Sequence, residues 1–240
     1  MQFEVVQNDL TQMHADALVL PANEQLREGS GTSHAIFERA GRKELTKACR
    51  ELRSCPIGEA VPTLAFKLDA KYIIHAVVPK WVDGEHEEYE YLSSAYLSAL
   101  KIADIMNCSS IAFPLLASGN NGFELNLAYE IAKESLSRFE PTNLQKVYLV
   151  VYGDTIATFL RGKGVKVMNL QSAGQHIKDN NPLINKFVQL GDQGKQFAIK
   201  AVEEEIDKAI NYLKDPKNRK QIIDAGFAVA KVVLEFVKKK

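Results

Sequence analysis

Residues 16–41 read DALVLPANEQLREGSGTSHAIFERAG, and this stretch decides the fold of the chain. A short apolar run is followed by a turn, a Gly-x-Gly loop and a helical pattern. Residues 17–20 are typical of a buried strand. We expect the strand to stop at Pro21, because proline cannot donate to a sheet ladder. Gly29 and Gly31 permit positive φ and a close approach of the backbone to a ligand.

The loop of residues 29–33 opens onto a helix that is expected to start near His34. Thr32 or Ser33 can cap that helix. A small-residue loop at a helix N-terminus can bind an anion, because amides without intrahelical partners and the helix dipole both point outward. A plain strand–loop–helix connection is the alternative for this stretch taken alone.

A second stretch repeats the arrangement. Residues 111–123 read IAFPLLASGNNGF: an apolar run leads into the small-residue loop 118–122, and a helical pattern follows from about Leu125. Loops at the carboxyl ends of neighbouring strands line the crevice where open α/β sheets usually bind ligands. The two loops are therefore expected to face one hollow.

The two stretches resemble the macro domain family. Its patterns are roughly Asp-Ala-Ile-Val-Asn-Ala-Ala-Asn, then Gly-Gly-Gly-Val/Thr-Asp-x-Ala-Ile, and later Phe-Pro-Leu-Ile-Ser/Ala-Thr-Gly-x-x-Gly-Phe-Pro. The segments NDLT (8–11), PIGEA (56–60) and AKYIIH (70–75) also match, in the family's order, within residues 1–160. The resemblance implies a three-layer α/β/α fold with a mixed, mainly parallel sheet, and it implies binding of ADP-ribose.

The resemblance also implies roles for individual residues. Asp9 would accept from the adenine amino group, although a turn former is the simpler reading. Asn23 would bind the distal ribose, and Tyr152 would lie against the adenine unless it is only a core-edge tyrosine. The implied ligand-binding set is Asp9, Leu10, Asn23, Gly29, Gly31, Thr32, Ser33, Ser118, Gly119, Asn120, Asn121, Gly122, Phe123 and Tyr152.

The chain departs from the family pattern at five positions. Ser33 stands where the commonest hydrolase type has the Asp that activates water, and a serine hydroxyl is too weak a base to replace it. Ser30 replaces the middle glycine of the first loop. Leu20, Asn121 and Glu124 replace an asparagine, an aromatic residue and a proline. We therefore expect a reader of ADP-ribose or a related nucleotide first, and an ADP-ribosyl or O-acetyl-ADP-ribose hydrolase second.

Two histidines need separate interpretation. His34 could titrate near neutral pH and is the one candidate catalytic residue, but a first-turn helix residue is the alternative reading. His75 lies in an apolar strand and is read as a core histidine. A third possibility for the function is a structural or regulatory protein. Its ligand pocket would be filled, and the C-terminal helices would carry the function. No cofactor and no metal site is predicted.

Composition restricts the class of protein. Apolar content of 46% and charged content of 25% are ordinary for a globular chain. Residues 1–170 carry a net charge of −4 and residues 171–240 a net +4, so the front part is a poor non-specific nucleic-acid binder. Three cysteines in an odd count argue against disulfides. The sequence has no pattern typical of a signal peptide or a membrane span, which predicts a cytoplasmic protein.

The remaining elements complete a predicted division into a macro domain (1–170), a linker (171–194) and a helical hairpin (195–240). Further strands are expected at 3–6, which should join an edge of the sheet, and at 61–66, 72–77, 111–116 and 147–152. Helices are expected at 34–52, 91–106, 127–139, 196–213 and 216–237. In the last of these helices, Asp215 fits the N-cap position and Pro216 fits the first helical position. The apolar second helix of the extension should pack on its neighbour, on the main domain or on a second copy, so a protein partner or self-association through 195–240 is a hypothesis.

Overall fold

The computed structural model describes residues 1–169, 204, 206–208, 210–212, 214–222 and 224. The predicted linker at 171–194 and most of the predicted hairpin lie outside these residues. Among the described residues, no helix combines the length and the apolar content needed to cross a bilayer. The three cysteines are buried and form no disulfide.

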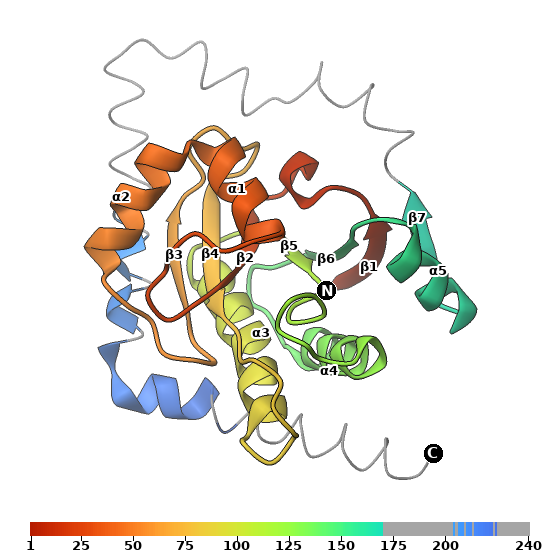
Figure 1. Ribbon diagram of the computed structural model, residues 1–240. Coiled ribbons are helices and arrows are strands. Elements are labelled where there is room, and N and C mark those ends of the chain that lie inside the picture. Colours follow the sequence, from red (N-terminus) through yellow and green to blue (C-terminus); the bar gives the residue numbers. More distant parts are fainter. Residues whose placement is uncertain (170–203, 205, 209, 213, 223, 225–240) are drawn as a thin grey trace.

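A seven-stranded sheet in the order β3-β4-β2-β5-β6-β1-β7 forms the middle layer (Figure 1). β3 runs antiparallel to β4, and every other neighbouring pair is parallel. The mixed, mainly parallel sheet expected from the sequence is therefore confirmed. The strands are β1 (Gln2–Gln7), β2 (Ala17–Ala22), β3 (Ala60–Leu64), β4 (Tyr72–Val77), β5 (Ser110–Pro114), β6 (Lys146–Val151) and β7 (Val167–Asn169).

Helices cover both faces of the sheet and enclose two hydrophobic clusters. α1 (Thr32–Ala40) and α2 (Arg42–Leu52) bury Ile36, Phe37 and Leu45 against one face. α3 (Glu88–Ile105) and α4 (Leu125–Arg138) pack on the other face, where Ala157 and Leu160 of α5 (Asp154–Gly162) join their cluster. A 3-10 helix, η1 (Leu10–Gln12), follows β1. The three-layer α/β/α fold is confirmed.

The strand before the first loop is longer than expected. β2 continues through Pro21, which pairs with Ala76 of β4. β5 pairs with β2 only at Ala17 and Leu18, so beyond Leu18 one side of β2 has no neighbouring strand. A residue without an N–H is tolerated where a strand has an open side. The prediction that the strand ends at Pro21 was wrong for this reason.

The helix expected over residues 34–52 is two helices. Gly41 separates α1 from α2 with a φ of 104°, a conformation that favours glycine. The prediction that Thr32 or Ser33 caps the first helix was also wrong. Gly31 holds the N-cap position of α1 and no side chain caps that end.

The N-terminal strand does not lie at an edge. β1 pairs with β6 on one side and with β7 on the other, so the short β7 is the edge strand. Neither β7 nor α5 was predicted. The three residues of β7 and the nine residues of α5 are too few to show a clear hydrophobic periodicity in the sequence.

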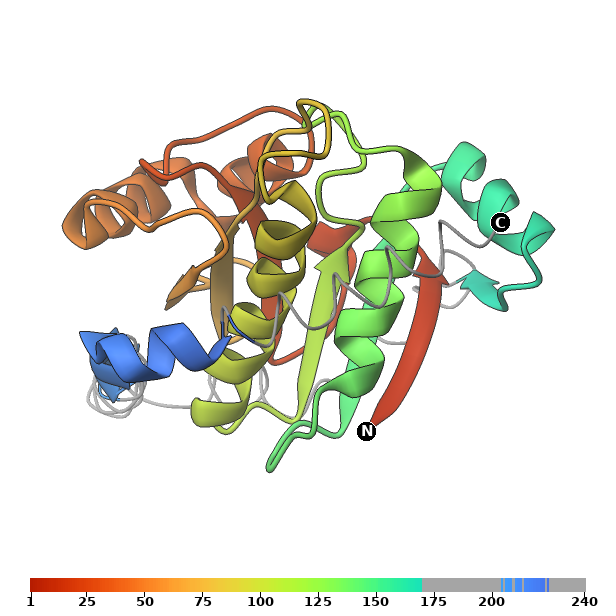
Figure 2. The same ribbon diagram turned by 90° about the horizontal axis from the view of Figure 1, so that it is seen from below.

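The described part of the C-terminal extension packs on the main domain. Ile206, Tyr212 and Ile222 lie against the hydrophobic cluster between the sheet and α3. Arg219 forms an ion pair with Glu59, just before β3, at 3.1 Å. Figure 2 shows these helical segments beside β3 and α3. Of the three packing modes considered, the described residues show packing on the main domain.

The expected cap at the start of the last helix is confirmed. The Asp215 carboxylate accepts a hydrogen bond from the Lys217 amide at 2.9 Å, and Pro216 follows it directly. Proline suits this place because the first helical amide has no intrahelical acceptor.

Candidate functional site

A cavity of about 370 Å³ opens where β1, β5 and β6 end. Its volume lies within the range of ligand pockets, about 300–1,000 Å³. The wall combines the turn after β1, the N-terminus of α1, the loop after β5 and the start of α5. The lining residues are Asn8, Asp9, Leu10, Thr11, Gly31, Thr32, Ala35, Pro114, Leu115, Ser118, Val150, Val151, Tyr152 and Ile156.

The N-terminus of α1 supplies unpartnered amides to this cavity. Gly31 adopts φ 60° and ψ −126°, which an L side chain would strain, and this turn starts the helix with no side-chain cap. The first intrahelical bond runs from the Ala35 amide to the Gly31 carbonyl at 3.1 Å. The preceding amides have no helical acceptor. Because Gly31 and Thr32 line the cavity, the positive end of the helix dipole faces it.

The loop after β5 supplies a second group of amides. The amides of residues 118–121 donate to no acceptor within the part of the chain that the structure describes. The Gly122 amide is different, because it bonds the Gly119 carbonyl at 3.0 Å and closes the turn. Of the predicted cradle, Gly122 therefore shapes the loop, while the amides before it stay free for a ligand. Ser118 lines the cavity directly.

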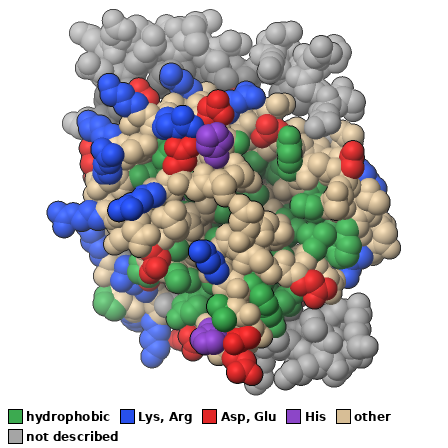
Figure 3. Space-filling model, in the orientation of Figure 1, with side chains coloured by type: hydrophobic (Ala, Val, Ile, Leu, Met, Phe, Trp, Pro, Cys, Tyr) green, Lys and Arg blue, Asp and Glu red, His purple; other side chains and the backbone are tan. Residues whose placement is uncertain are grey.

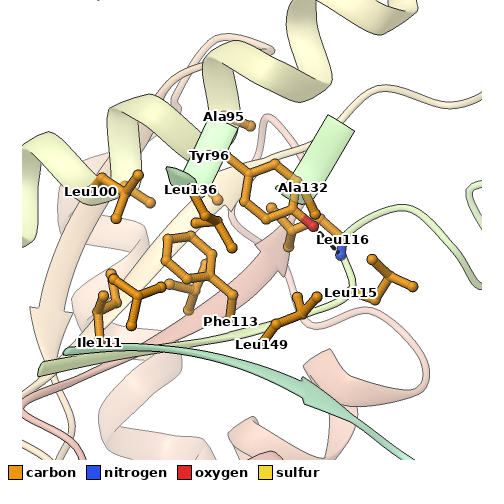
Figure 4. Packing of buried hydrophobic residues seen from close by; sticks show 14 of the residues in the cluster. Ala95, Tyr96, Leu100, Ile111, Phe113, Leu115, Leu116, Ala132, Leu136 and Leu149 are labelled. Carbon is orange, nitrogen blue, oxygen red and sulfur yellow. Dashed lines mark hydrogen bonds between the residues drawn. The ribbon is translucent and has the colours of Figure 1, made fainter. Parts of the chain in front are cut away.

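Buried side chains hold this second loop in place. The Tyr96 hydroxyl on α3 accepts a hydrogen bond from the Leu116 amide at 2.9 Å (Figure 4). The next residue, Ala117, has a φ of 62°, a strained value for a residue with a Cβ. Phe123 is buried and meets Trp81 edge-on, with ring centroids 5.2 Å apart. The loop conformation is thus fixed from beneath by α3 and from one side by the loop after β4.

The two glycine-bearing loops meet, as the sequence predicted. The Asn120 side-chain amide donates to the Ser30 hydroxyl at 2.6 Å. The cavity between the loops is open, so the reading in which the chain's own side groups fill the pocket is not supported. On the face shown in Figure 3, Lys and Arg side chains gather mainly over α2 on the left.

Three predicted ligand contacts lie at the opposite wall or rim. Asp9 lines the cavity, and its Oδ1 accepts from both the amide and the hydroxyl of Thr11 at 2.8 Å. The carboxylate therefore caps η1, which confirms the turn-forming reading, and its contact with an adenine amino group stays a prediction for a residue that lines the cavity. Leu10 is buried in the wall. The Tyr152 side chain is 73% exposed at the rim and is free to lie against a flat group.

The remaining predicted residues do not line the cavity. Asn23 closes its own turn, because its side chain accepts from the Arg27 amide at 3.0 Å and donates to the Arg27 carbonyl at 2.8 Å. The Ser33 hydroxyl is buried and accepts from the Gly29 amide at 3.0 Å. The others outside the lining are Gly29, Gly119, Asn120, Asn121, Gly122 and Phe123.

Sequence reasoning missed part of the wall. The missed lining residues are Asn8, Thr11, Ala35, Pro114, Leu115, Val150, Val151 and Ile156. Pro114, Val150 and Val151 are apolar residues at the ends of strands, where the only sequence signal is burial. Asn8 and Thr11 flank Asp9 in a segment that was noted, so proximity to Asp9 was the available signal. Ile156 comes from α5, which was not predicted.

His34 lies in a surface ion cluster. Its Nδ1 is 2.8 Å from the Glu28 carboxylate, which also binds the Arg42 guanidinium at 2.8 Å. The Arg42 hydrogen bond is the main cause that lowers the pKa of Glu28. The His34 side chain is 55% exposed and is absent from the cavity lining. At this position the His34 side chain does not reach the cavity, so it does not serve there as a general base.

Asp83, His86 and Glu88 form the one group of potential metal ligands among the described residues. Glu88 is buried and accepts from the amides of residues 82, 83, 84 and 86. Burial acts to raise the pKa of Glu88, but these backbone hydrogen bonds outweigh it and lower the pKa to about 2. The Glu88 carboxylate therefore holds the loop after β4 in place. Its hydrogen bonds to these amides explain why a charged group is buried here, without a metal ion.

Comparison with known proteins identifies relatives that cover about two thirds of the chain. The model of the Macro domain family matches residues 19–132. An O-acetyl-ADP-ribose deacetylase of Escherichia fergusonii is 40% identical over 159 residues, spanning 64% of this chain and 89% of that protein. A macro domain-containing protein of Listeria monocytogenes is 39% identical over 162 residues, spanning 64% and 92%. The Oceanobacillus iheyensis macrodomain with ADP superimposes with a TM-score of 0.63 at 30% identity, covering 67% of this chain and 88% of that one.

Proposed function

Because the chain belongs to the macro domain family, we propose that it binds ADP-ribose and acts as a reader of ADP-ribosylation. The observation that carries the proposal is the convergence of two groups of unpartnered amides on one open cavity. One group is the uncapped N-terminus of α1, and the other is the loop of residues 118–121. Backbone amides at a helix N-terminus or in a turn bind phosphate groups without a bulk positive charge.

We assign the adenine and the pyrophosphate to residues of the cavity lining and the distal ribose to Asn23, which lies outside that lining. Asp9 accepts from the adenine amino group, since an ionised carboxylate is a pure acceptor. Tyr152 at the rim lies against the adenine ring. The pyrophosphate lies between Gly31 and Ser118, which both line the cavity. Asn23 meets the distal ribose on the far side of the first loop, once its bonds to Arg27 have opened.

A binding role is favoured over hydrolysis by the chemistry at Ser33. The hydroxyl is buried and already accepts from the Gly29 amide. Asp9 is the single carboxylate among the lining residues, and it lies on the opposite wall beside η1. The loss of one general base lowers a rate by roughly 10²- to 10⁴-fold, whereas a cradle of backbone amides keeps its affinity.

Hydrolysis of ADP-ribosyl esters is the second candidate, favoured by relatives that are named O-acetyl-ADP-ribose deacetylases. The test is release of acetate from O-acetyl-ADP-ribose at high protein concentration. Turnover that disappears in the Asp9→Ala variant would establish the activity and displace the reader role. Undiminished substrate would reject the hydrolase.

We propose that residues 1–170 form the binding module and that residues 195–240 carry a separate role. Residues 171–194 would be the linker that joins the two parts. The absence of disulfides among the three cysteines supports a reducing compartment, the cytoplasm, as the place where the protein acts. An ADP-ribosylated protein is the partner that follows from the reader role.

Isothermal calorimetry with ADP-ribose tests the proposal. The wild type should bind, and Asp9→Asn should lose roughly 10- to 100-fold in affinity, since a hydrogen bond to a charged group contributes about 1.5–3 kcal/mol. Glu51→Gln is the control, because it removes an exposed carboxylate on α2 whose one ion pair within the described part of the chain is with Lys47. Absence of heat with millimolar ADP-ribose would refute the binding role.

A further inference from the structure

A buried glutamine joins the first strand to α5. Gln7 is the last residue of β1 and is 5% exposed. Its Nε2 donates to the Asp154 carboxylate at 2.8 Å, and its Oε1 accepts from the Arg161 guanidinium at 2.9 Å. Asp154 stands in the first turn of α5 and Arg161 in its last turn. One side-chain amide therefore holds both ends of this helix, which lies at the β7 end of the sheet (Figure 1).

The apolar contact of α5 with the rest of the domain is small. The helix has nine residues, of which Ala157 and Leu160 are buried. Among the described residues, no side chain caps its N-terminus, where Gly153 has φ 78° and ψ 171°. A helix of this length is marginal without tertiary contacts. The two Gln7 bonds therefore help to orient a helix that its own apolar face holds only weakly.

The same helix supplies part of the cavity wall. Ile156 lies two residues after Asp154 and lines the cavity, and Tyr152 lies two residues before Asp154 and also lines it. Asn8, the residue after Gln7, belongs to the lining as well. The hydrogen bonds of Gln7 thus adjoin the cavity on both of the elements that they join. A shift of α5 relative to β1 would change the distance between Ile156 and Asn8.

We propose that Gln7 is a positioning residue for the base-binding end of the cavity, because it holds α5 where Ile156 forms the wall. The inference rests on the proposed function, in which the adenine lies at this end, and adds a residue that touches no part of the ligand. Gln7 is absent from the cavity lining, so it acts through α5. The pyrophosphate is assigned to Gly31 and Ser118, whereas the Gln7 side chain bonds α5. The effect of Gln7 is therefore expected on the base and not on the pyrophosphate.

Dissociation constants for ADP-ribose and for inorganic pyrophosphate, measured on the full chain, test the inference. Gln7→Leu keeps a similar side-chain volume and removes both bonds. It should weaken ADP-ribose binding roughly 2- to 10-fold, which is the net value of an ordinary hydrogen bond, and leave pyrophosphate binding unchanged. Hydrogen exchange of residues 154–162 should become faster. Gln2→Leu makes the same change at the exposed start of β1 and should alter none of these quantities.

Variants at Asp154 supply a second measurement at an exposed side chain, whose removal leaves the core intact. Asp154→Ala removes the acceptor for the Gln7 amide, whereas Asp154→Asn keeps an acceptor oxygen in the same place. Asp154→Ala should therefore weaken ADP-ribose binding, with pyrophosphate binding unchanged, and Asp154→Asn should retain most of the affinity. The double variant Gln7→Leu/Asp154→Ala should lose no more than Gln7→Leu, because the two changes remove the same bond. A purely structural role would lower thermal stability without a difference between the two ligands.

The outcomes separate the two proposals. If the wild type binds ADP-ribose and both Gln7→Leu and Asp154→Ala bind it equally well, the positioning role is wrong and the proposed function stands. Equal losses of ADP-ribose and pyrophosphate affinity would also overturn the inference, since Gln7 would then support the whole cavity. If the wild type does not bind ADP-ribose, the proposed function itself fails and the inference fails with it. Thermal unfolding of each variant shows whether it is folded.

Discussion

His75 is predicted to make the stability of this protein fall between about pH 6.5 and pH 4. The side chain is fully buried in β4, its Nε2 lies 2.9 Å from the Thr63 hydroxyl, and its Nδ1 has no partner among the described residues. The Cys49 sulfur lies 4.0 Å from Nε2. Burial lowers the pKa of His75 from 6.5 to about 4.

The sign and the magnitude follow from that shift. Below pH 6.5 the unfolded chain takes up a proton that the native His75 resists, so the free energy of unfolding falls as the pH falls. The loss is complete near the native pKa of about 4. With about 1.4 kcal/mol for each unit of pKa difference, the full loss is about 3 kcal/mol, and most of it is reached by about pH 4.5.

Urea denaturation at about pH 7 and at about pH 4.5 measures this loss. Asp104 does not interfere, because its pKa is lowered below 3.8 and its contribution is lost at more acid pH. In His75→Leu most of the slope over this pH window should disappear; the lowered pKa of Glu88 and the raised pKa of His86 leave a small remainder. If that variant does not fold, Thr63→Val/His75→Leu removes both partners of the buried bond. An equal slope in the wild type and in a folded variant would refute the reasoning.

Three further predictions concern groups that hold loops and segments in place. Tyr96→Phe should cost about 1–3 kcal/mol in urea denaturation and weaken ADP-ribose binding, because the buried Leu116 amide loses its acceptor. Equal affinity in this variant would show that the second loop is fixed by other contacts. Glu88→Gln should cost about 2 kcal/mol and speed proteolysis after β4, since four backbone amides bond this carboxylate. Arg219→Met should detach the C-terminal segment from Glu59 and increase its hydrogen exchange, with little change in ADP-ribose affinity; unchanged exchange would contradict a docking role for the ion pair.

The sequence was most informative where the signal is local. An apolar run that ends in small residues predicted both loops, and the Asn120 contact with Ser30 confirms that they meet. Asp9 was identified through the resemblance of residues 8–11 to the family pattern, and it lines the cavity. Such features depend on residues within a few positions, which a single sequence displays directly.

Features that depend on tertiary contacts were not predictable in the same way. The break at Gly41 interrupts an otherwise continuous amphipathic pattern, and only its φ of 104° reveals two helices. Ser33 suits a helix cap by type, yet its hydroxyl accepts from Gly29 instead. Ile156 reaches the cavity because α5 packs beside β7, and neither element is long enough to produce a periodic signal.

The position of β1 has a consequence for how the chain is made. Gln2 pairs with Lys146 of β6, and Val5 pairs with Val167 of β7. β1 is synthesised first, so it cannot form these pairs until β6 and β7 have left the ribosome. At roughly 5–20 residues per second that delay is on the order of 10 s. During this delay the nascent chain exposes both edges of β1, which are targets for chaperones and for pairing with neighbouring chains. Truncation before residue 146 would leave β1 permanently without either neighbour.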